Sequence, residues 1–487
     1  MRMRACLALA IATSLYATEP DSATRRWWSH VVALSGDDLQ GRDTGSEGYV
    51  KAARYVVTQF ERAGLKPAGE NGYYQSVPLH EIRLVPGRSK AELLHQSSVS
   101  PLRWLHNLTI RMQEPMPRHI DAPLLFAGSS AAPANIVTRG KLLVVLNGHS
   151  PRPVPSDALG VISIDDPHAL EPPRWPLQYS VSMRLHETPP GNATALAFRF
   201  NPADAELLFR FSGHTYRELA DLTQRDEPLP WFDLAQTLRA DLAFTTADLK
   251  SDNILAVLPG SDPMLSKEYL VVSAHLDGYG IGEPWGEDKI YNGAFDDAAY
   301  VATLIDLAQR LRESGSHLRR SLLFCVVTAE EKGLLGSKYF AAHPTIPKEQ
   351  LIADINLDQL RPIFPLRTLT TLALDQSTLG DTVKSVAKTM DIQIQPDPEP
   401  QRNLLRRSDH WSFMQIGVPA VGFVFGYEKG SPDEAAYREW YARRYHSPLD
   451  DINQPWLPAA AAKFNDFFEK LVVTIADAPS RPAWTKR

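Results

Sequence analysis

The chain has 487 residues, of which 44% are hydrophobic and 22% are charged, and its formal net charge is −6. These values are ordinary for a globular protein, and the acidic surplus offers no basic surface for binding nucleic acid. The length allows about two or three domains. There are two cysteines, Cys6 and Cys325. Since Cys6 lies in the amino-terminal segment described next, we expect no internal disulfide.

Residues 1–17 have the pattern of a secretory signal peptide. Two arginines precede an apolar run from Ala5 to Ala17, which is too short for a stable bilayer anchor. The alternative is a buried amino-terminal helix. No later stretch approaches the ~18 apolar residues of a membrane span. We therefore expect an exported protein without an integral membrane segment after signal removal. Export without disulfides is typical of a bacterial periplasm or exterior. The oligomeric state stays open.

Two segments with different patterns follow the signal. Residues 18–117 begin with two predicted helices around a Gly-rich loop, and the second helix has apolar residues at helical spacing between Tyr49 and Phe60. Residues 118–235 are rich in proline and in short β runs, including "RGKLLVVLNG" and "ALGVISIDDP". The second segment therefore predicts a separate β-rich domain inserted into the chain.

Residues 236–487 alternate between strands and helices. The strand "YLVVSAHLDG" is followed by a helix from Asp296 to Ser314, and then by the strands "SLLFCVVTAEE", "LIADINLDQL" and "VPAVGFVFG" with helices between them. This alternation predicts an α/β fold with a mainly parallel central sheet covered by helices on both faces. In such sheets the reactive groups gather at the carboxyl ends of the strands.

Acidic and histidine side chains fall at these strand ends and in loops. The ends and loops carry His275, Asp277, Asp296, Asp297, Glu330, Glu331, Asp358 and His446. Adjacent acids such as Glu330 and Glu331 are often only decoration of the first turn of a helix. So many carboxylates at one edge, however, would repel one another without a cation. Two histidines and three carboxylates form a suitable ligand set for zinc.

The same motifs resemble the two-zinc exopeptidase family of secreted aminopeptidases. The resemblance rests on "SAHLDG", "NGAFDDAA", "TAEEKGLLGS", "INLDQL", "RSDHWSF" and "RYHSPLDD", and on the earlier "LQGRDTGSEGYVKAARYVVTQFERAGLKPAG". It implies a peptidase domain formed by residues 18–117 and 236–487. Residues 118–235 are similar to a protease-associated (PA) domain, with a weaker match.

The resemblance also implies roles for the matching residues. His275 and Asp358 would bind one zinc ion, Glu331 and His446 the other, and Asp296 both. The metal pair would supply a hydroxide that attacks the amino-terminal peptide bond.

The remaining roles concern protons and orientation. Glu330 would be the general base, Asp277 would orient a ligand, and Tyr445 would hydrogen-bond the developing oxyanion. Arg407, Ser408 and Asp409 resemble a pocket-wall motif. His410 is expected to be structural, and Asp450 and Asp451 to cap a loop.

The most favoured function is therefore a zinc aminopeptidase acting on peptides, with two zinc ions and no organic cofactor. Three alternatives stay open: a carboxypeptidase of the same fold, an acyl transferase like the glutaminyl cyclases, and a non-catalytic receptor-like protein. The chain departs from the family pattern at Phe295 and at Asp297 to Tyr300. These departures spare the ligands and affect only the expected shape of the pocket.

Overall fold

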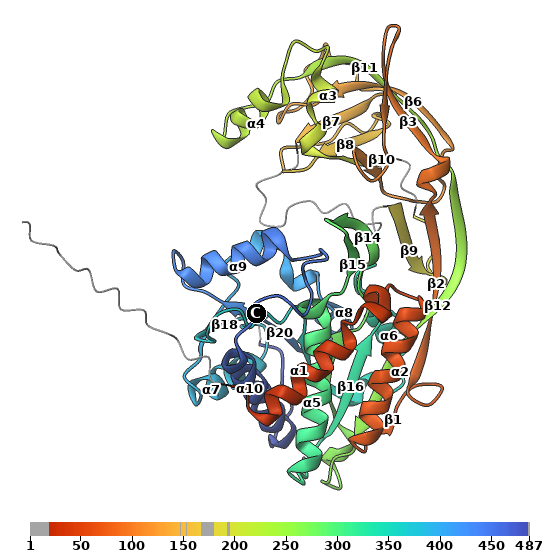
Figure 1. Cartoon of the computed structure of the whole chain (residues 1–487). Coiled ribbons are helices and arrows are strands. Elements are labelled where there is room, and N and C mark those ends of the chain that lie inside the picture. Colours follow the sequence, from red (N-terminus) through yellow and green to blue (C-terminus); the bar gives the residue numbers. More distant parts are fainter. Residues whose placement is uncertain (1–18, 147, 152, 167–179, 192–194, 486–487) are drawn as a thin grey trace, which may run out of the picture.

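The computed structural model describes residues 19–485 except 147, 152, 167–179 and 192–194 (Figure 1). The signal peptide predicted for residues 1–17 lies outside the described residues. Among the residues that are described, no helix combines the length and the apolar character needed to cross a bilayer.

The larger part of the protein is built on one long sheet. In spatial order its strands are β19 (Gln393–Gln395), β18 (Thr368–Leu372), β20 (Ala420–Gly426), β17 (Leu351–Leu357), β13 (Tyr269–His275), β16 (Ser321–Val327), β12 (Phe244–Leu258), β2 (Tyr74–Leu84) and β9 (Val181–Leu185), with β1 (Lys66–Pro67) paired to β12. The four central strands β20, β17, β13 and β16 run parallel. The flank formed by β12, β2 and β9 is antiparallel. The predicted α/β class is confirmed, with the parallel strands at the centre of a mixed sheet.

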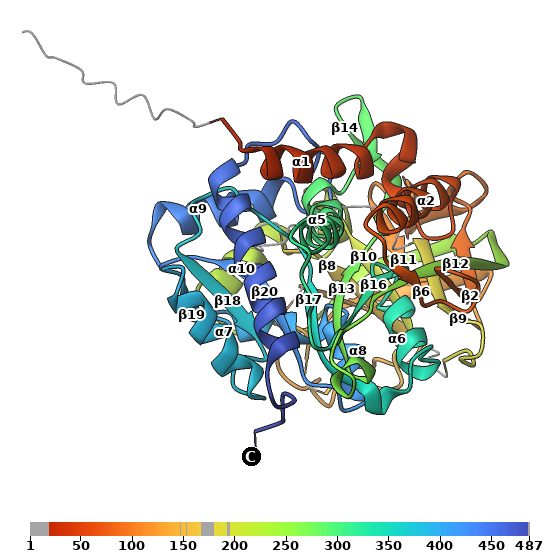
Figure 2. The same cartoon turned by 90° about the horizontal axis from the view of Figure 1, so that it is seen from below.

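Helices cover both faces of this sheet (Figure 2). Helices α1, α2, α5, α7 and α10 pack in one core cluster with the sheet, and α6 and α8 contribute to a second. Strand β16 is buried on both sides, because Phe324 belongs to the first cluster and its neighbour Cys325 to the second. The bounds are α1 (Ser22–Leu34), α2 (Glu47–Arg62), α5 (Ala299–Glu313), α6 (Leu335–Ala342), α7 (Leu379–Lys388), α8 (His410–Gln415), α9 (Pro432–Arg443) and α10 (Pro458–Asp477).

A second sheet has its own apolar core. Its strands are, in spatial order, β4 (Ser98–Leu102), β3 (Lys90–His95), β11 (Phe232–Asp241), β6 (His119–Phe126), β7 (Leu142–Leu146), β8 (Gly160–Ile164), β10 (Leu196–Phe200) and β5 (Leu108–Ile110). Two short helices accompany it, α3 (Glu206–Phe209) and α4 (Tyr216–Gln224).

The two sheets are joined along one edge by the long strands β2 and β12, as Figure 1 shows. The paired residues of these strands run from Tyr74 opposite Ile254 to Leu84 opposite Phe244. The strands of the second sheet span Lys90 to Asp241, a wider range than the 118–235 assigned from sequence. Whether this sheet is a PA domain stays a prediction.

Candidate metal centre

Four of the predicted site residues lie where parallel strands of the central sheet end. His275 is the last residue of β13, Asp358 directly follows β17, and Glu330 and Glu331 follow β16. The carboxyl ends of neighbouring parallel strands meet at one edge of a sheet, where α/β proteins bind their ligands. The fold therefore brings these side chains together although they are far apart in the sequence.

Asp296 reaches the same edge from the segment that precedes α5. The sequence predicts that the helix begins at Asp296, but α5 begins at Ala299, and Asp296 and Asp297 have non-helical backbone angles. The side chain of Asp450 explains the difference, because its carboxylate accepts hydrogen bonds from the backbone amides of Phe295 and Asp296, at 3.0 and 3.1 Å. The predicted capping role of Asp450 thus serves the segment that carries Asp296.

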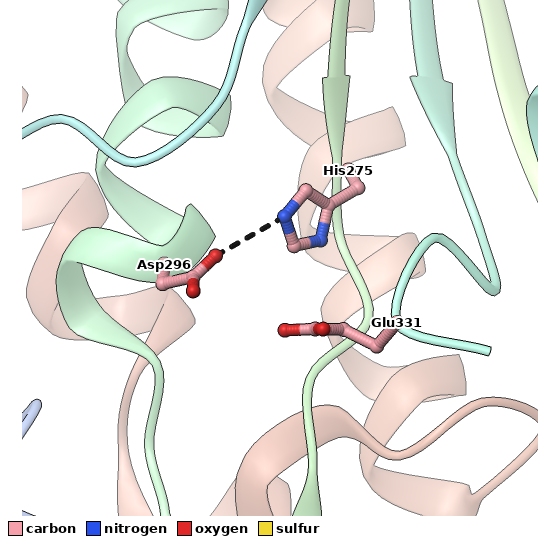
Figure 3. Close-up of side chains that lie close together, drawn as sticks. All are labelled: His275, Asp296 and Glu331. Carbon is pink, nitrogen blue, oxygen red and sulfur yellow. Dashed lines mark ion pairs between the residues drawn. The ribbon is translucent and has the colours of Figure 1, made fainter. Parts of the chain in front are cut away.

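Three side chains form a compact group of possible metal ligands. One ligand atom each of His275, Asp296 and Glu331 lies within 4.8 Å of the others. Figure 3 shows the three side chains pointing toward one another, with Nε2 of His275 3.3 Å from Oδ1 of Asp296. On the same side, Nε2 of His275 lies 3.9 Å from Oδ1 of Asp358.

His446 approaches the opposite oxygen of Asp296. It lies in the loop after α9, and its Nε2 is 3.2 Å from Oδ2 of Asp296 and 3.7 Å from Oε1 of Glu331. The hydroxyl of Tyr279 lies 3.1 Å from the imidazole nitrogens of His446. Asp296 therefore stands between two pairs, His275 with Asp358 and Glu331 with His446.

The hydrogen bonding of these atoms fits a bound cation. Among the described residues, His275 Nε2, Asp296 Oδ2, Glu331 Oε1 and Asp358 Oδ1 are buried and have no hydrogen-bond partner. Burial raises the pKa of Glu331 to about 7 and raises the pKa of Asp358. Buried polar atoms without partners are rare in folded proteins. Four of them, from one histidine and three carboxylates, converge here, and these are the donor types that zinc prefers.

Asp277 orients the imidazole of His275. The Nδ1 atom of His275 lies 3.1 Å from the backbone oxygen of Asp277, so the proton sits on Nδ1 and the Nε2 lone pair faces the centre. The carboxylate of Asp277 is itself held by the Thr44 hydroxyl, at 3.0 Å, and by the backbone amide of Glu330, at 3.0 Å. Thr44 is a contributor that the sequence did not single out.

The two adjacent glutamates are not the first turn of a helix. Helix α6 begins only at Leu335, with Leu334 as the residue before it, so the helix-decoration alternative is wrong. Glu330 and Glu331 both line one cavity of about 330 Å³. Burial raises the pKa of Glu330 well above that of an ordinary glutamate. Burial of this kind favours the protonated form of a carboxyl group.

Two of the three predicted pocket-wall residues, Arg407 and Ser408, also line this cavity, whereas the buried Asp409 does not. Arg407, Ser408 and Tyr445 line it, and Nη2 of Arg407 donates to the Tyr445 hydroxyl at 3.3 Å. The Ser408 hydroxyl donates to Oδ2 of Asp358 at 2.5 Å. Ser408 thus fixes one oxygen of Asp358, which leaves Oδ1 to face His275.

Apolar side chains complete the cavity wall. They are Leu334, Leu372, Leu404, Phe423 and Val424. Phe295, one of the departures from the family pattern, is fully buried and packs edge-on against Trp28 with ring centroids 6.5 Å apart. It therefore belongs to the core beneath the site.

Arg42 is a second contributor that the sequence did not reveal. It is fully buried, and its guanidinium donates to the backbone oxygens of Leu276, Asn292 and Gly293 at 2.8, 2.5 and 3.0 Å. These carbonyls flank the loops that carry Asp277 and Asp296. Only long-range contacts create this role, so no local sequence signal could have found it.

The neighbouring Gly41 allows the backbone beside Arg42 to pass close to Gly280. Its φ is +69°, and a Cβ atom there would lie 2.5 Å from the backbone oxygen of Gly280. A residue with a side chain would both strain the backbone and clash with β14 (Gly280–Trp285), which pairs with β15 (Asp288–Tyr291).

A mixed α/β sheet with two histidines and three carboxylates at the carboxyl edge defines the zinc-exopeptidase class of fold. The resemblance expected from the sequence is confirmed over this part of the chain, because the family model described as "Peptidase family M28" matches residues 253–472. Those residues contain all five predicted ligands.

Solved structures share the fold over nearly the whole chain. An aminopeptidase from Aneurinibacillus sp. strain AM-1 is 18% identical, with a TM-score of 0.60 over 94% of this chain and 95% of that one. A zinc aminopeptidase from Bacillus subtilis is 16% identical, with a TM-score of 0.57 over 92% and 94%. At these identities the likeness shows the fold alone.

One curated relative matches in sequence over a shorter stretch. Leupeptin-inactivating enzyme 1 of Streptomyces exfoliatus is 26% identical over 217 residues, which are 43% of this chain and 45% of the relative. The match thus spans less than half the length of that relative.

Proposed function

We propose that the protein is a zinc-dependent metallo-exopeptidase that removes the amino-terminal residue from peptides. The observation that carries the proposal is the position of Asp296 between two ligand pairs. One of its oxygens is 3.3 Å from His275 Nε2 and the other is 3.2 Å from His446 Nε2. A carboxylate that faces a separate ligand pair with each oxygen is suited to bridge two metal ions.

The five ligand side chains divide between two zinc ions in this proposal. His275 and Asp358 would hold one, Glu331 and His446 would hold the other, and Asp296 would contribute to both. When bound, the zinc pair supplies a hydroxide nucleophile near neutral pH and polarises the substrate carbonyl.

Glu330 carries the proton between the nucleophile and the leaving amine. It lines the cavity beside Glu331 and Asp358, and burial raises its pKa. A base with a raised pKa can return the proton it has taken, which is what peptide-bond cleavage requires. The bond from the Glu330 amide to Asp277 fixes the turn that presents this side chain.

Tyr445 donates a hydrogen bond to the oxygen of the scissile carbonyl as negative charge develops there. It lines the cavity next to His446, and the two rings stack with centroids 3.5 Å apart. A preorganised donor of this kind acts mainly in the transition state.

The cavity size supports attack at a chain end. A volume of about 330 Å³ lies at the lower end of ordinary ligand pockets, so it accommodates a terminal residue and its neighbour. The apolar wall formed by Leu372, Leu404 and Phe423 suits the side chain of that residue.

Carboxypeptidase action is the second candidate, and a specific observation favours it. Lys338, Arg406 and Arg407 also line the cavity, and cationic side chains favour a substrate carboxylate. The remaining alternatives, acyl transfer and a receptor-like role, differ in metal content, with one zinc expected for a cyclase and none for a receptor.

The test compares three substrates in the presence of zinc: a free tripeptide, its amino-acetylated form and its carboxy-amidated form. Aminopeptidase action requires cleavage of the free and amidated peptides only. Cleavage of the acetylated peptide with loss of the amidated one assigns the carboxypeptidase. No cleavage of any peptide over a broad residue panel would reject the peptidase.

Export of the protein is a further part of the proposal. It is supported by the arginines and the apolar run within residues 1–17, and it places the enzyme in the periplasm or outside a bacterial cell. We also propose that the second sheet is the PA-like insert. Its position beside the catalytic sheet (Figure 1) is suited to influencing substrate access.

A further inference from the structure

Gln359 directly follows Asp358 at the end of β17 and lines the same cavity. Its φ is +65°, an uncommon value for a residue with a side chain. This backbone conformation places its amide group beside aromatic residues of α9 and of the loop that follows it.

The partners of the Gln359 amide fix its orientation. Its Oε1 accepts hydrogen bonds from the Tyr441 hydroxyl at 2.8 Å and from Nη1 of Arg361 at 3.0 Å. A guanidinium has donors only, so the atom facing Arg361 must be the amide oxygen. The amide nitrogen then faces the other way, where Nε2 donates to the Tyr445 hydroxyl at 3.1 Å.

Arg361 is itself held firmly. It is fully buried, and its guanidinium lies over the rings of Tyr437, Trp440 and Tyr441, at 5.3, 5.1 and 4.5 Å from the centroids. Cations over aromatic faces are stabilised electrostatically, more strongly away from water. The donor that sets the Gln359 amide therefore has little freedom to move.

This arrangement determines how the Tyr445 hydroxyl is used. Its oxygen accepts from Gln359 Nε2 and also from Arg407 Nη2. Both contacts use the oxygen as an acceptor, so neither consumes the hydroxyl proton. A phenol whose oxygen already accepts bonds from the protein is a better donor, because chained hydrogen bonds polarise one another.

We propose that Gln359 is a positioning residue that, oriented by Arg361 and Tyr441, keeps the Tyr445 hydroxyl directed as a donor to the substrate carbonyl oxygen. The inference rests on the role of Tyr445 in the proposed function. It adds a residue to which the sequence analysis gave no role, and it predicts that the polarity of one amide controls turnover.

The test reverses that polarity. In Gln359→Glu the side chain keeps its shape, and one carboxylate oxygen still accepts from Arg361 and Tyr441. The other oxygen now accepts a hydrogen bond from the Tyr445 hydroxyl, so this hydroxyl no longer donates to the substrate. We expect kcat to fall by roughly 10²–10³-fold, the usual loss of one oxyanion donor, with KM little changed. A fall confined to kcat marks an interaction made in the transition state.

Comparison with Tyr445→Phe separates positioning from a structural effect. If Gln359 acts through Tyr445, Gln359→Glu adds little to the loss already caused by Tyr445→Phe, whereas a structural defect lowers turnover equally in both backgrounds. Gln395→Glu is the matched control, because Gln395 Nε2 also donates to a hydroxyl, that of Thr370 at 2.9 Å, outside the cavity. It should leave kcat and metal content unchanged.

Three outcomes would overturn the inference. If kcat is unchanged in Gln359→Glu but reduced in Tyr445→Phe, the positioning role of Gln359 is rejected and the role of Tyr445 stands. Full activity of Tyr445→Phe rejects the inference and the role of Tyr445, while metal-dependent cleavage by the wild type still upholds the peptidase. Loss of zinc from Gln359→Glu, measured by elemental analysis, shows that Gln359 acts on the neighbouring Asp358. Gln359→Met, which has no donor and no charge, should show an intermediate loss of kcat with full metal content.

Discussion

The backbone amide of Glu330 donates a hydrogen bond to Oδ1 of Asp277 at 3.0 Å. This bond ties the turn after β16 to the residue that orients His275. The two adjacent glutamates are thereby presented to the same cavity with different neighbours. Glu331 lies 3.7 Å from Nε2 of His446, whereas Glu330 has a raised pKa caused first by burial.

The two glutamates should therefore respond differently to loss of charge. Glu330→Gln should keep its metal and its fold while turnover falls by roughly 10²–10⁴-fold, as expected for a lost general base. Glu331→Gln should lose metal together with activity. Metal content measured beside turnover distinguishes the two roles. Near wild-type turnover in Glu330→Gln would make the assignment of the base wrong, whatever Glu331 does.

Metal removal should abolish activity reversibly. A strong chelator should stop hydrolysis, and added zinc or cobalt should restore it, because the proposed nucleophile forms only at the metal pair. A metal ion that binds only the folded state also stabilises that state, and the stabilisation grows with the free metal concentration. The melting temperature of the metal-free protein should therefore rise as zinc is titrated. Undiminished turnover in exhaustively metal-free protein would contradict the mechanism.

His410 should make stability sensitive to acid. It is fully buried, and burial lowers the pKa of its imidazole to about 4. Between pH 6.5 and 4 the unfolded chain binds a proton at this residue and the folded chain does not, so stability falls as the pH falls. His410 alone should lower the free energy of unfolding by about 2 kcal/mol between pH 7 and pH 5.

Urea unfolding of metal-free protein at pH 7 and pH 5 measures this loss. The His410→Gln variant lacks the titrating group. Compared with the wild type, its free energy of unfolding at pH 5 should therefore be higher by about 2 kcal/mol, relative to the value at pH 7. Burial raises the pKa values of Glu331, Asp409 and Asp450 to about 7, effects of opposite sign that are common to both proteins and cancel in the comparison. An equal pH dependence in the two proteins would show that His410 does not titrate as described.

The second sheet should be dispensable for metal binding. Strands β2 and β12 end opposite each other, with Leu84 paired to Phe244 and the amide of Val85 bonded to the oxygen of Ala243 at 2.8 Å. Replacing residues 86–242 with Asn-Gly closes these strands as a two-residue hairpin. All five ligands remain, so we expect full zinc content with an altered substrate range.

This shortened protein also loses β9, which exposes the edge of β2. Reduced solubility is therefore expected, and circular dichroism must first establish that the variant is folded. Absence of both metals from a folded variant would show that the second sheet contributes to the site.

The strand ends that carry the ligands were predictable, because β13, β16 and β17 are short apolar runs that end in His or acidic residues. The helices between these strands were predicted from the alternation of strand-like and helix-like segments. The start of α5 was not predictable, since the carboxylate of Asp450 delays it from Asp296 to Ala299 through two backbone hydrogen bonds. Helix α9 was not predicted, although its buried residues Tyr437, Trp440 and Tyr441 have helical spacing.

The supporting side chains were harder to predict than the ligands. A ligand is recognisable because an acid or histidine after an apolar strand is unusual. Arg42 and Gln359, in contrast, belong to residue types that are common on surfaces. Their roles depend on contacts with segments that only the fold brings near. For Gln359, the contacts with Tyr441 and Tyr445 join residues more than 80 positions apart, with separations of 82 and 86.

The long sequence separation between Arg42 and its hydrogen-bond partners also affects when the protein can fold during synthesis. Its partners Leu276 and Gly293 lie 234 and 251 residues further along the chain, and His446 comes later still. Contacts of such separation form late in folding. A nascent chain therefore holds no complete metal centre until nearly all of it has been synthesised. Partial products and fragments that begin after Arg42 should therefore be inactive.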